Sequence, residues 1–155
     1  MLQQPCRVHT KKKLRTLTMT QVVAAIIEKE GRILVGRRTA EQSHPHKWEF
    51  PGGKLEPGES PAEALTRELK EELDIDAAEG HELTHYEFAY PGKAPILLFF
   101  HRVRSYRGEP RNLIYREMRW AHAHELIEMD FVEGDRDFLY WLNGISDQDG
   151  RSRRE

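Results

Sequence analysis

The segment from Gly53 to Ile75 constrains the fold of this chain more than any other stretch of its 155 residues. Glycine turns are expected where it begins, at residues 51–53, and within it, at residues 57–58. Glycine favours such turns because it reaches positive φ without steric cost. Ser60 then fits the N-cap of a helix, Pro61 its first position and Glu63 the capping box. Leucines recur every four residues, at 65, 69 and 73. This pattern predicts a turn followed by a helix over residues 61–73 that packs on a core.

Three glutamates, Glu68, Glu71 and Glu72, crowd the second half of the predicted helix. At about 100° per residue, Glu68 and Glu72 lie on one side of the helix and next to the leucine stripe. Like charges this close repel one another, and Mg²⁺ takes hard oxygen ligands and substrate phosphates. A solvated helix face is the alternative for an isolated glutamate pair. The whole frame instead favours a site that holds a divalent metal ion against a phosphate chain.

This frame resembles the Nudix box: Gly53, five residues, Glu59, seven residues, then Arg67-Glu68-Leu69-Lys70-Glu71-Glu72 and Ile75. Its one departure is Asp74, where the family usually has glycine; Asp tolerates the left-handed conformation of a C-cap better than most residues. The flanks resemble the MutT-like branch over residues 20–142, at Arg37-Arg38, residues 47–54, residues 108–110, and Glu117 with Trp120. The resemblance implies a hydrolase with an α+β fold, the Nudix α/β/α sandwich with a mixed central sheet.

The same resemblance implies a set of metal ligands and catalytic carboxylates. Glu68 and Glu72 would bind Mg²⁺, or Mn²⁺ in its place, with Glu71 close by and the Gly52 carbonyl as a further ligand. Glu117 matches an additional acidic residue of the family that could bind another metal ion. Glu68, Glu71 and Glu117 form the expected catalytic set; Glu71 and Glu117 are both candidates for the general base, and the sequence does not choose between them.

Substrate contacts are expected on the other side of the site. Arg38 resembles the arginine that contacts the phosphate tail, with Arg37 as the alternative. The residues expected to contact the nucleotide nearer its base are His44, Glu49, Phe50 and Pro51. Solvent exposure is the alternative for His44, and ordinary core packing is the alternative for Phe50.

Asp135 aligns with the asparagine with which MutT reads oxidised guanine. An ionised Asp only accepts hydrogen bonds, whereas Asn donates and accepts, and a protonated, buried Asp regains a donor. The sequence therefore leaves 8-oxo-dGTP, CTP, dCTP and 5-methyl-dCTP open as substrates. A stabilising charge at a helix N-terminus is the alternative role for Asp135.

The predicted function is a Mg²⁺-dependent nucleoside triphosphate pyrophosphohydrolase that releases NMP and pyrophosphate. Hydrolysis of 8-oxo-dGTP would make it a nucleotide-pool sanitiser linked to DNA repair; (d)CTP or 5-methyl-dCTP hydrolysis is the alternative. Another nucleoside diphosphate derivative is a further alternative. A non-catalytic nucleotide-binding module is disfavoured because the glutamates are intact. A zinc enzyme built on His44 and His46, or on His122 and His124, would have two ligands at most.

Composition sets the remaining expectations. The length favours one domain, and a net charge of −2 gives no reason to expect a stable nucleic-acid partner. The longest apolar run, residues 96–100, is far too short to cross a membrane, and the single cysteine, Cys6, excludes an internal disulfide. We expect a cytoplasmic protein with a Nudix domain over residues 19–143, a basic N-terminal tail over residues 1–18 and a polar C-terminal tail over residues 144–155. The oligomeric state is left open.

Periodicity and turn signals predict the elements around the box. Two strands joined as a hairpin are expected at residues 21–28 and 32–37. Further strands are expected at residues 48–50, 81–90, 96–104 and 115–121, and further helices at residues 124–129 and 134–142.

Overall fold

The computed structural model describes residues 19–151, with side chains described as far as residue 144. Both predicted tails extend outside these ranges. The strands are β1 (Thr20–Ile26), β2 (Glu28–Lys29), β3 (Arg32–Arg37), β4 (Trp48–Glu49), β5 (Gly52–Lys54), β6 (Asp76–Phe88), β7 (Ile96–Arg107) and β8 (Glu117–Ala121). The helices are α2 (Pro61–Leu73), α3 (Ala123–Leu126), the 3₁₀ turn η1 (Glu133–Asp135) and α4 (Arg136–Arg151).

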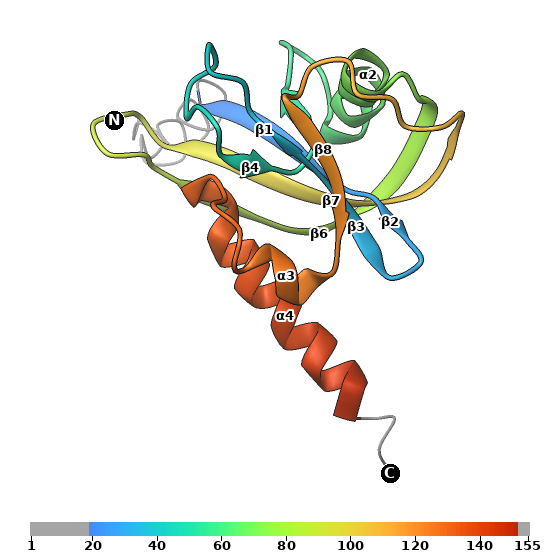
Figure 1. Cartoon of the computed structure of the whole chain (residues 1–155). Helices are drawn as coiled ribbons and strands as arrows, with labels where there is room; N and C mark the ends of the chain where they lie inside the picture. The colour runs from blue at the N-terminus through green and yellow to red at the C-terminus, as the bar shows by residue number, and fades with distance from the viewer. Residues whose placement is uncertain (1–18, 152–155) are drawn as a thin grey trace, which may run out of the picture.

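Two four-stranded sheets form the centre of the molecule. The first has the order β5-β1-β7-β6, with β1 and β7 parallel and the other pairs antiparallel. In the second, β3 pairs antiparallel with β2, β4 and β8. Helix α2 lies on one side of the strands, and α3 and α4 lie on the other (Figure 1). The expected α+β sandwich with a mixed sheet is confirmed.

Each side of the first sheet has its own apolar core. Val23 and Ala25 of β1 pack with the leucine stripe of α2. Their neighbours Ala24 and Ile26 point to the opposite face and pack with Phe138 and other residues of α4. Strand β1 is therefore buried on both faces, as is typical of a central strand with a parallel neighbour. In the part of the chain that the structure describes, no helix is long and apolar enough to cross a membrane.

The predicted hairpin between residues 21–28 and 32–37 is wrong for most of its length. Only Glu28 and Lys29, which form β2, pair with β3. Strand β1 instead pairs with β7 along its whole length, from Thr20 opposite Ile96 to Ile26 opposite Arg102. The continuous apolar run of β1 needs cover on two faces, which a two-stranded hairpin does not provide.

The predicted helices agree with the structure to different degrees. The helix at residues 61–73 is confirmed residue for residue. The expected helix at residues 134–142 begins as a 3₁₀ turn and then continues as α4 to Arg151, so it is longer than its apolar pattern indicated. The short helix expected at residues 124–129 is a single turn, α3.

Candidate active site

Helix α2 is fixed at both ends by its own side chains. The Ser60 hydroxyl accepts a hydrogen bond from the Glu63 N–H, and the Glu63 carboxylate accepts one from the Ser60 N–H, which completes the predicted capping box. At the other end Asp74 adopts the left-handed conformation, with φ 55°. Its carboxylate accepts hydrogen bonds from Lys70 and Arg111. These contacts explain how an aspartate replaces the usual glycine of the box without disturbing the helix.

The glycine turn packs directly against the glutamates of α2. The Gly52 N–H donates a hydrogen bond to Glu72 Oε2 at 3.2 Å. A Cβ atom on Gly53 would lie 2.4 Å from the Glu68 carboxyl carbon. An alanine at position 53 would push the Glu68 carboxylate aside, so glycine lets the backbone of strand β5 lie this close to it.

Glu72 is buried, with 8% of its surface exposed, which is unusual for a glutamate. Its Oε2 accepts a second hydrogen bond, from the Tyr115 hydroxyl at 2.8 Å. Burial raises the pKa of Glu72 to about 8, although the two hydrogen bonds favour the ionised form; the nearby charges of Glu49 and Glu68 raise it further. A cation bound beside this carboxylate would relieve the cost of ionising it.

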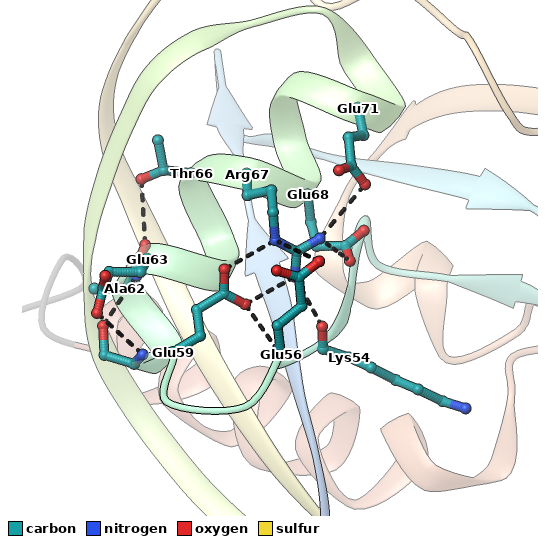
Figure 2. Close-up of polar contacts among 10 residues, drawn as sticks. Lys54, Glu56, Glu59, Ala62, Glu63, Thr66, Arg67, Glu68 and Glu71 are labelled. Atoms are coloured by element: carbon teal, nitrogen blue, oxygen red, sulfur yellow. Dashed lines mark hydrogen bonds and ion pairs between the residues drawn. The ribbon is translucent and has the colours of Figure 1, made fainter.

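Arg67 holds the acidic groups on the outer side of the cluster (Figure 2). Its guanidinium donates two hydrogen bonds of 2.8 Å to the two carboxylate oxygens of Glu59 and one of 2.9 Å to Glu68. It also bonds the Lys54 carbonyl at 3.0 Å and approaches Glu71 at 3.5 Å. Hydrogen bonds from Arg67 lower the pKa of Glu59 to about 2, whereas burial raises the pKa of Glu68. Glu59 therefore connects the loop before α2 to the helix through Arg67.

Arg38, which we expect to contact the phosphate tail, is held by its neighbours Ser43 and Glu49, and its role toward the substrate stays a prediction. Its Nη1 donates hydrogen bonds to both carboxylate oxygens of Glu49, each at 2.9 Å, and it also bonds the backbone and side chain of Ser43. Burial raises the pKa of Glu49. Glu49 pairs with Gly36, which lies against the Tyr115 ring, so the Glu49 carboxylate is on the same face as Tyr115 and Glu72.

Asp135 is the second buried acid of the site, with 7% of its surface exposed. Burial raises its pKa to about 8; the charge of Glu49 adds to this, and a hydrogen bond from the Phe50 backbone opposes it. The Phe50 ring packs among Phe100, Phe131 and Phe138, so its side chain belongs to the core and its backbone to the site. The charge of Glu49 raises the pKa of both Glu72 and Asp135, so Glu49 lies near both carboxyl groups.

Two further predicted substrate residues are Pro51 and His44. Pro51 is buried, and its carbonyl accepts a hydrogen bond from the Ala25 N–H at 2.7 Å. His44 has a left-handed backbone, with φ 50°, and its ring lies 4.4 Å from that of Tyr90. Partial burial and nearby cations lower the pKa of His44, so its ring is neutral at pH 7.

Residues 17–142 match the family model described as NUDIX domain. The chain belongs to the NUDIX family. It is 35% identical over 119 residues to the CTP pyrophosphohydrolase of Escherichia coli, covering 77% of this chain and 87% of that protein. It is 40% identical over 123 residues to the 8-oxo-dGTP diphosphatase of Haemophilus influenzae, covering 79% and 90%.

Two solved structures share the fold of this chain. The solution structure of the E. coli ORF135 protein superposes with a TM-score of 0.74 at 33% identity, covering 84% of this chain and 93% of that one. The crystal structure of a MutT NUDIX hydrolase from Burkholderia pseudomallei has a TM-score of 0.70 at 22% identity, covering 79% and 97%. The expected resemblance to MutT-like Nudix hydrolases is confirmed.

Glu117 is not brought to the NUDIX carboxylate cluster. Its carboxylate pairs with Arg119 at 2.8 Å, and the Arg119 guanidinium lies 4.8 Å from the centre of the Trp48 ring. The next residue, Met118, packs with the core beneath α2. Because successive side chains of a strand point to opposite faces, Glu117 faces away from Glu72. Its expected metal-binding and catalytic role stays a prediction that no contact supports.

Within the described residues, no three His, Cys, Asp or Glu side chains are already arranged as a metal-ligand set. Arg67 pairs with Glu68 and Glu71, while Tyr115 and Gly52 hold Glu72. The donor chemistry nevertheless fits Mg²⁺, since the NUDIX glutamates supply hard oxygens. Glu68 and Glu72 are both largely shielded from water.

Tyr115 is a site residue that the sequence did not reveal. We expect Tyr115→Phe to raise the pKa of Glu72 further, because the hydroxyl hydrogen bond favours the ionised carboxylate. Binding of Mg²⁺ should then require a higher pH, which calorimetric titrations between pH 6 and pH 9 would measure. Tyr140→Phe, at a residue with 60% of its surface exposed on α4, is the matched control. Identical pH dependence in Tyr115→Phe and wild type would contradict the expectation.

Proposed function

We propose that this NUDIX protein is a Mg²⁺-dependent nucleoside triphosphate pyrophosphohydrolase that releases NMP and pyrophosphate. The observation that carries the proposal is the buried Glu72, held by the Gly52 N–H and the Tyr115 hydroxyl next to Glu68. A carboxylate desolvated in this way, with acidic neighbours, is suited to bind a divalent cation. The names of the two similar proteins, a CTP pyrophosphohydrolase and an 8-oxo-dGTP diphosphatase, support a nucleoside triphosphate as the substrate.

The roles of the chain's own residues follow from their positions. Glu68, Glu72 and the Gly52 carbonyl would hold Mg²⁺, and Mn²⁺ could replace it. When bound, the metal ion supplies charge neutralisation for the phosphates and lowers the pKa of the attacking water. Glu71 is exposed at the edge of the cluster, and its contact with Arg67 is long, at 3.5 Å, so we assign it the role of accepting the proton. This geometry favours Glu71 over Glu117 as the general base.

A nucleotide panel with Mg²⁺ tests the proposal, with pyrophosphate and phosphate release measured separately. The panel contains 8-oxo-dGTP, dGTP, CTP, dCTP, 5-methyl-dCTP and several sugar nucleotides. Pyrophosphate release from a triphosphate is the expected result. Turnover of sugar nucleotides alone would instead assign the site to another nucleoside diphosphate derivative, and binding without turnover would indicate a non-catalytic module.

Asp135 and Glu49 are proposed to select the base. A pKa near 8 keeps Asp135 protonated at pH 7, so its carboxyl group can both donate and accept a hydrogen bond. That pattern matches the carbonyl and N–H of an oxidised guanine, and equally the ring nitrogen and amino group of cytosine. Preference for 8-oxo-dGTP in the panel would assign nucleotide-pool sanitation, with a consequence for DNA repair; preference for a cytosine nucleotide would assign (d)CTP or 5-methyl-dCTP hydrolysis.

We expect Asp135→Asn to retain most of the kcat/KM for the preferred nucleotide, because an amide also donates and accepts. Asp135→Ala should lower it by about tenfold or more, since polar groups of the base are left unpaired. Above pH 8 the wild-type Asp135 loses its proton and its donor, so the kcat/KM of wild type should fall relative to that of Asp135→Asn. Steady-state kinetics between pH 6 and pH 9 would measure this. Parallel pH profiles for the two proteins would count against a protonated reader.

A further inference from the structure

The turn that carries Asp135 is attached to strand β4 on one side. The Trp48 N–H donates a hydrogen bond to the Asp130 carbonyl, and the Val132 N–H donates one to the Trp48 carbonyl, both at 2.9 Å. Phe131 thereby lies beside Trp48 as a short parallel bridge. This attachment fixes the turn next to Glu49, the residue after Trp48.

Two tyrosines attach the same turn on its other side. The Tyr86 hydroxyl, from β6, donates to the Gly134 carbonyl and accepts a hydrogen bond from the Phe138 N–H at 3.3 Å. The Tyr90 hydroxyl accepts a hydrogen bond from the Gly134 N–H at 3.1 Å. The N–H and the carbonyl of Gly134, immediately before Asp135, are therefore held by side chains from β6 and from the segment that follows it.

Tyr90 also contacts the other substrate-facing segment. Its ring packs against His44, with centroids 4.4 Å apart, and against Phe88 at 4.9 Å. One side chain thus touches the loop that carries Ser43 and His44 and, through its hydroxyl, the turn that carries Asp135. A shift of Tyr90 would move both segments relative to Glu49.

We propose that Tyr90, together with Tyr86, is a positioning residue that sets base selectivity by fixing Asp135 and the His44 loop. The inference rests on the proposed function, because it takes Asp135 as the group that contacts the base. Neither tyrosine needs to touch the reacting phosphates. Their loss therefore affects discrimination between bases more than the chemical step.

The close fit of the turn around Tyr90 supports this role. A Cβ atom on Gly134 would lie 2.9 Å from the Tyr90 hydroxyl and 3.3 Å from Leu98 Cδ1. A side chain at position 134 would collide with the Tyr90 hydroxyl, so the turn lies this close to Tyr90 because residue 134 is glycine. A substitution at position 134 therefore perturbs the same contact with Tyr90.

The main test compares the ratio of kcat/KM for the preferred nucleotide to that for a nucleotide with another base, in Tyr90→Phe and Tyr86→Phe. Tyr90→Phe removes one hydrogen bond and should lower this ratio by about three- to tenfold, mainly through a higher KM for the preferred nucleotide. Tyr86→Phe removes two hydrogen bonds and should lower the ratio at least as much. Tyr140→Phe, the same change on the exposed side of α4, is the control and should leave the ratio unchanged. An unchanged ratio in both test variants would overturn the inference.

A second pair of variants tests the same contact from the side of the turn. Gly134→Ala should lower the same ratio, and its further effect in a Tyr90→Phe background should be smaller because the closest clash is removed. Gly144→Ala on α4, where an added Cβ meets nothing within 4 Å, is the matched control. Fully independent effects of the changes at positions 90 and 134 would contradict the proposed contact.

Hydrogen exchange separates this inference from the proposed function. The Gly134 amide should exchange faster in Tyr90→Phe than in wild type, whatever the substrate. Exchange of the Gly134 amide as slow in Tyr90→Phe as in wild type would overturn the hydrogen bond from Gly134 to Tyr90. Faster exchange with an unchanged selectivity ratio would overturn the role of this hydrogen bond in selectivity. A wild-type protein that turns over no nucleotide in the panel would instead overturn the proposed function.

Discussion

Glu72→Gln should lower the rate of pyrophosphate release by more than about 100-fold. Loss of a group that only supports a metal ligand lowers activity by about 10- to 100-fold, and loss of a ligand itself should exceed this range. Glutamine has nearly the same shape, and its amide oxygen can still accept hydrogen bonds from the Gly52 N–H and the Tyr115 hydroxyl. It lacks the negative charge, which is the property that the proposed metal site needs. Steady-state kinetics with Mg²⁺ would measure the loss.

The control for this substitution is Glu79→Gln, which removes the same charge from an exposed position on β6. It should leave the rate unchanged, because surface charges away from the site have small effects. A Glu72→Gln variant that keeps its activity would show that Glu72 of the NUDIX helix does not take part in the proposed reaction.

Stability measurements distinguish lost chemistry from lost structure in the same variant. Without metal, the wild-type Glu72 keeps its proton up to about pH 8, whereas in the unfolded chain it releases the proton near 4.5. Between these values the unfolded state binds fewer protons, so the free energy of unfolding falls as the pH rises. Glu72→Gln removes this contribution. Urea unfolding in EDTA should therefore show a variant that is more stable than wild type at pH 8 and has a flatter pH dependence.

The sequence predicted the NUDIX helix well because the signals that define it are local. Ser60, Glu63 and the leucine stripe act within a few residues of one another, and the helix follows their pattern from Pro61 to Leu73. The link from Glu59 to Arg67 also spans only eight residues. Such contacts are encoded by spacing alone.

The contacts that the sequence did not reveal join distant segments. Tyr115 reaches Glu72 across 43 residues, and Tyr90 reaches Gly134 across 44. The parallel pairing of β1 with β7 is of the same kind, since residues 20 and 96 meet only after the sheet has formed. No local pattern specifies which distant partner a tyrosine or a strand selects, so these contacts depend on packing.

The two acidic residues that the resemblance predicted far from the box, Asp135 and Glu117, also depend on long-range packing. Asp135 was expected near the base, and the structure places it beside Phe50 and within the influence of Glu49. Glu117 was expected near the metal ions, and the register of β8 against β3 turns it to the opposite face. A shift of one residue along a strand reverses the face that a side chain occupies, and the motif alone does not fix that register.

Gly52→Ala should cost more stability than any other single glycine substitution in the turn and loop before α2. Gly52 has φ 147°, and an added Cβ would lie 1.9 Å from the Val23 carbonyl oxygen. Both the backbone conformation and the overlap oppose a side chain, and the obstacle is the backbone of the central strand β1, which cannot move aside by changing rotamer. We expect a loss of about 4 kcal/mol in the free energy of unfolding, in the range reserved for the most disruptive single substitutions.

Two neighbouring glycines are matched controls for this prediction. Gly58→Ala meets only the strain of its φ of 77°, because an added Cβ finds nothing within 4 Å, so it should cost about 1 kcal/mol. Gly53→Ala would press on the Glu68 carboxylate, a side chain that can move, so it should impair activity more than stability. Urea unfolding and steady-state rates on the three variants would separate these effects. Equal stability of Gly52→Ala and Gly58→Ala would show that β1 yields to an added methyl group, and that the close approach of β1 and β5 does not itself require glycine at position 52.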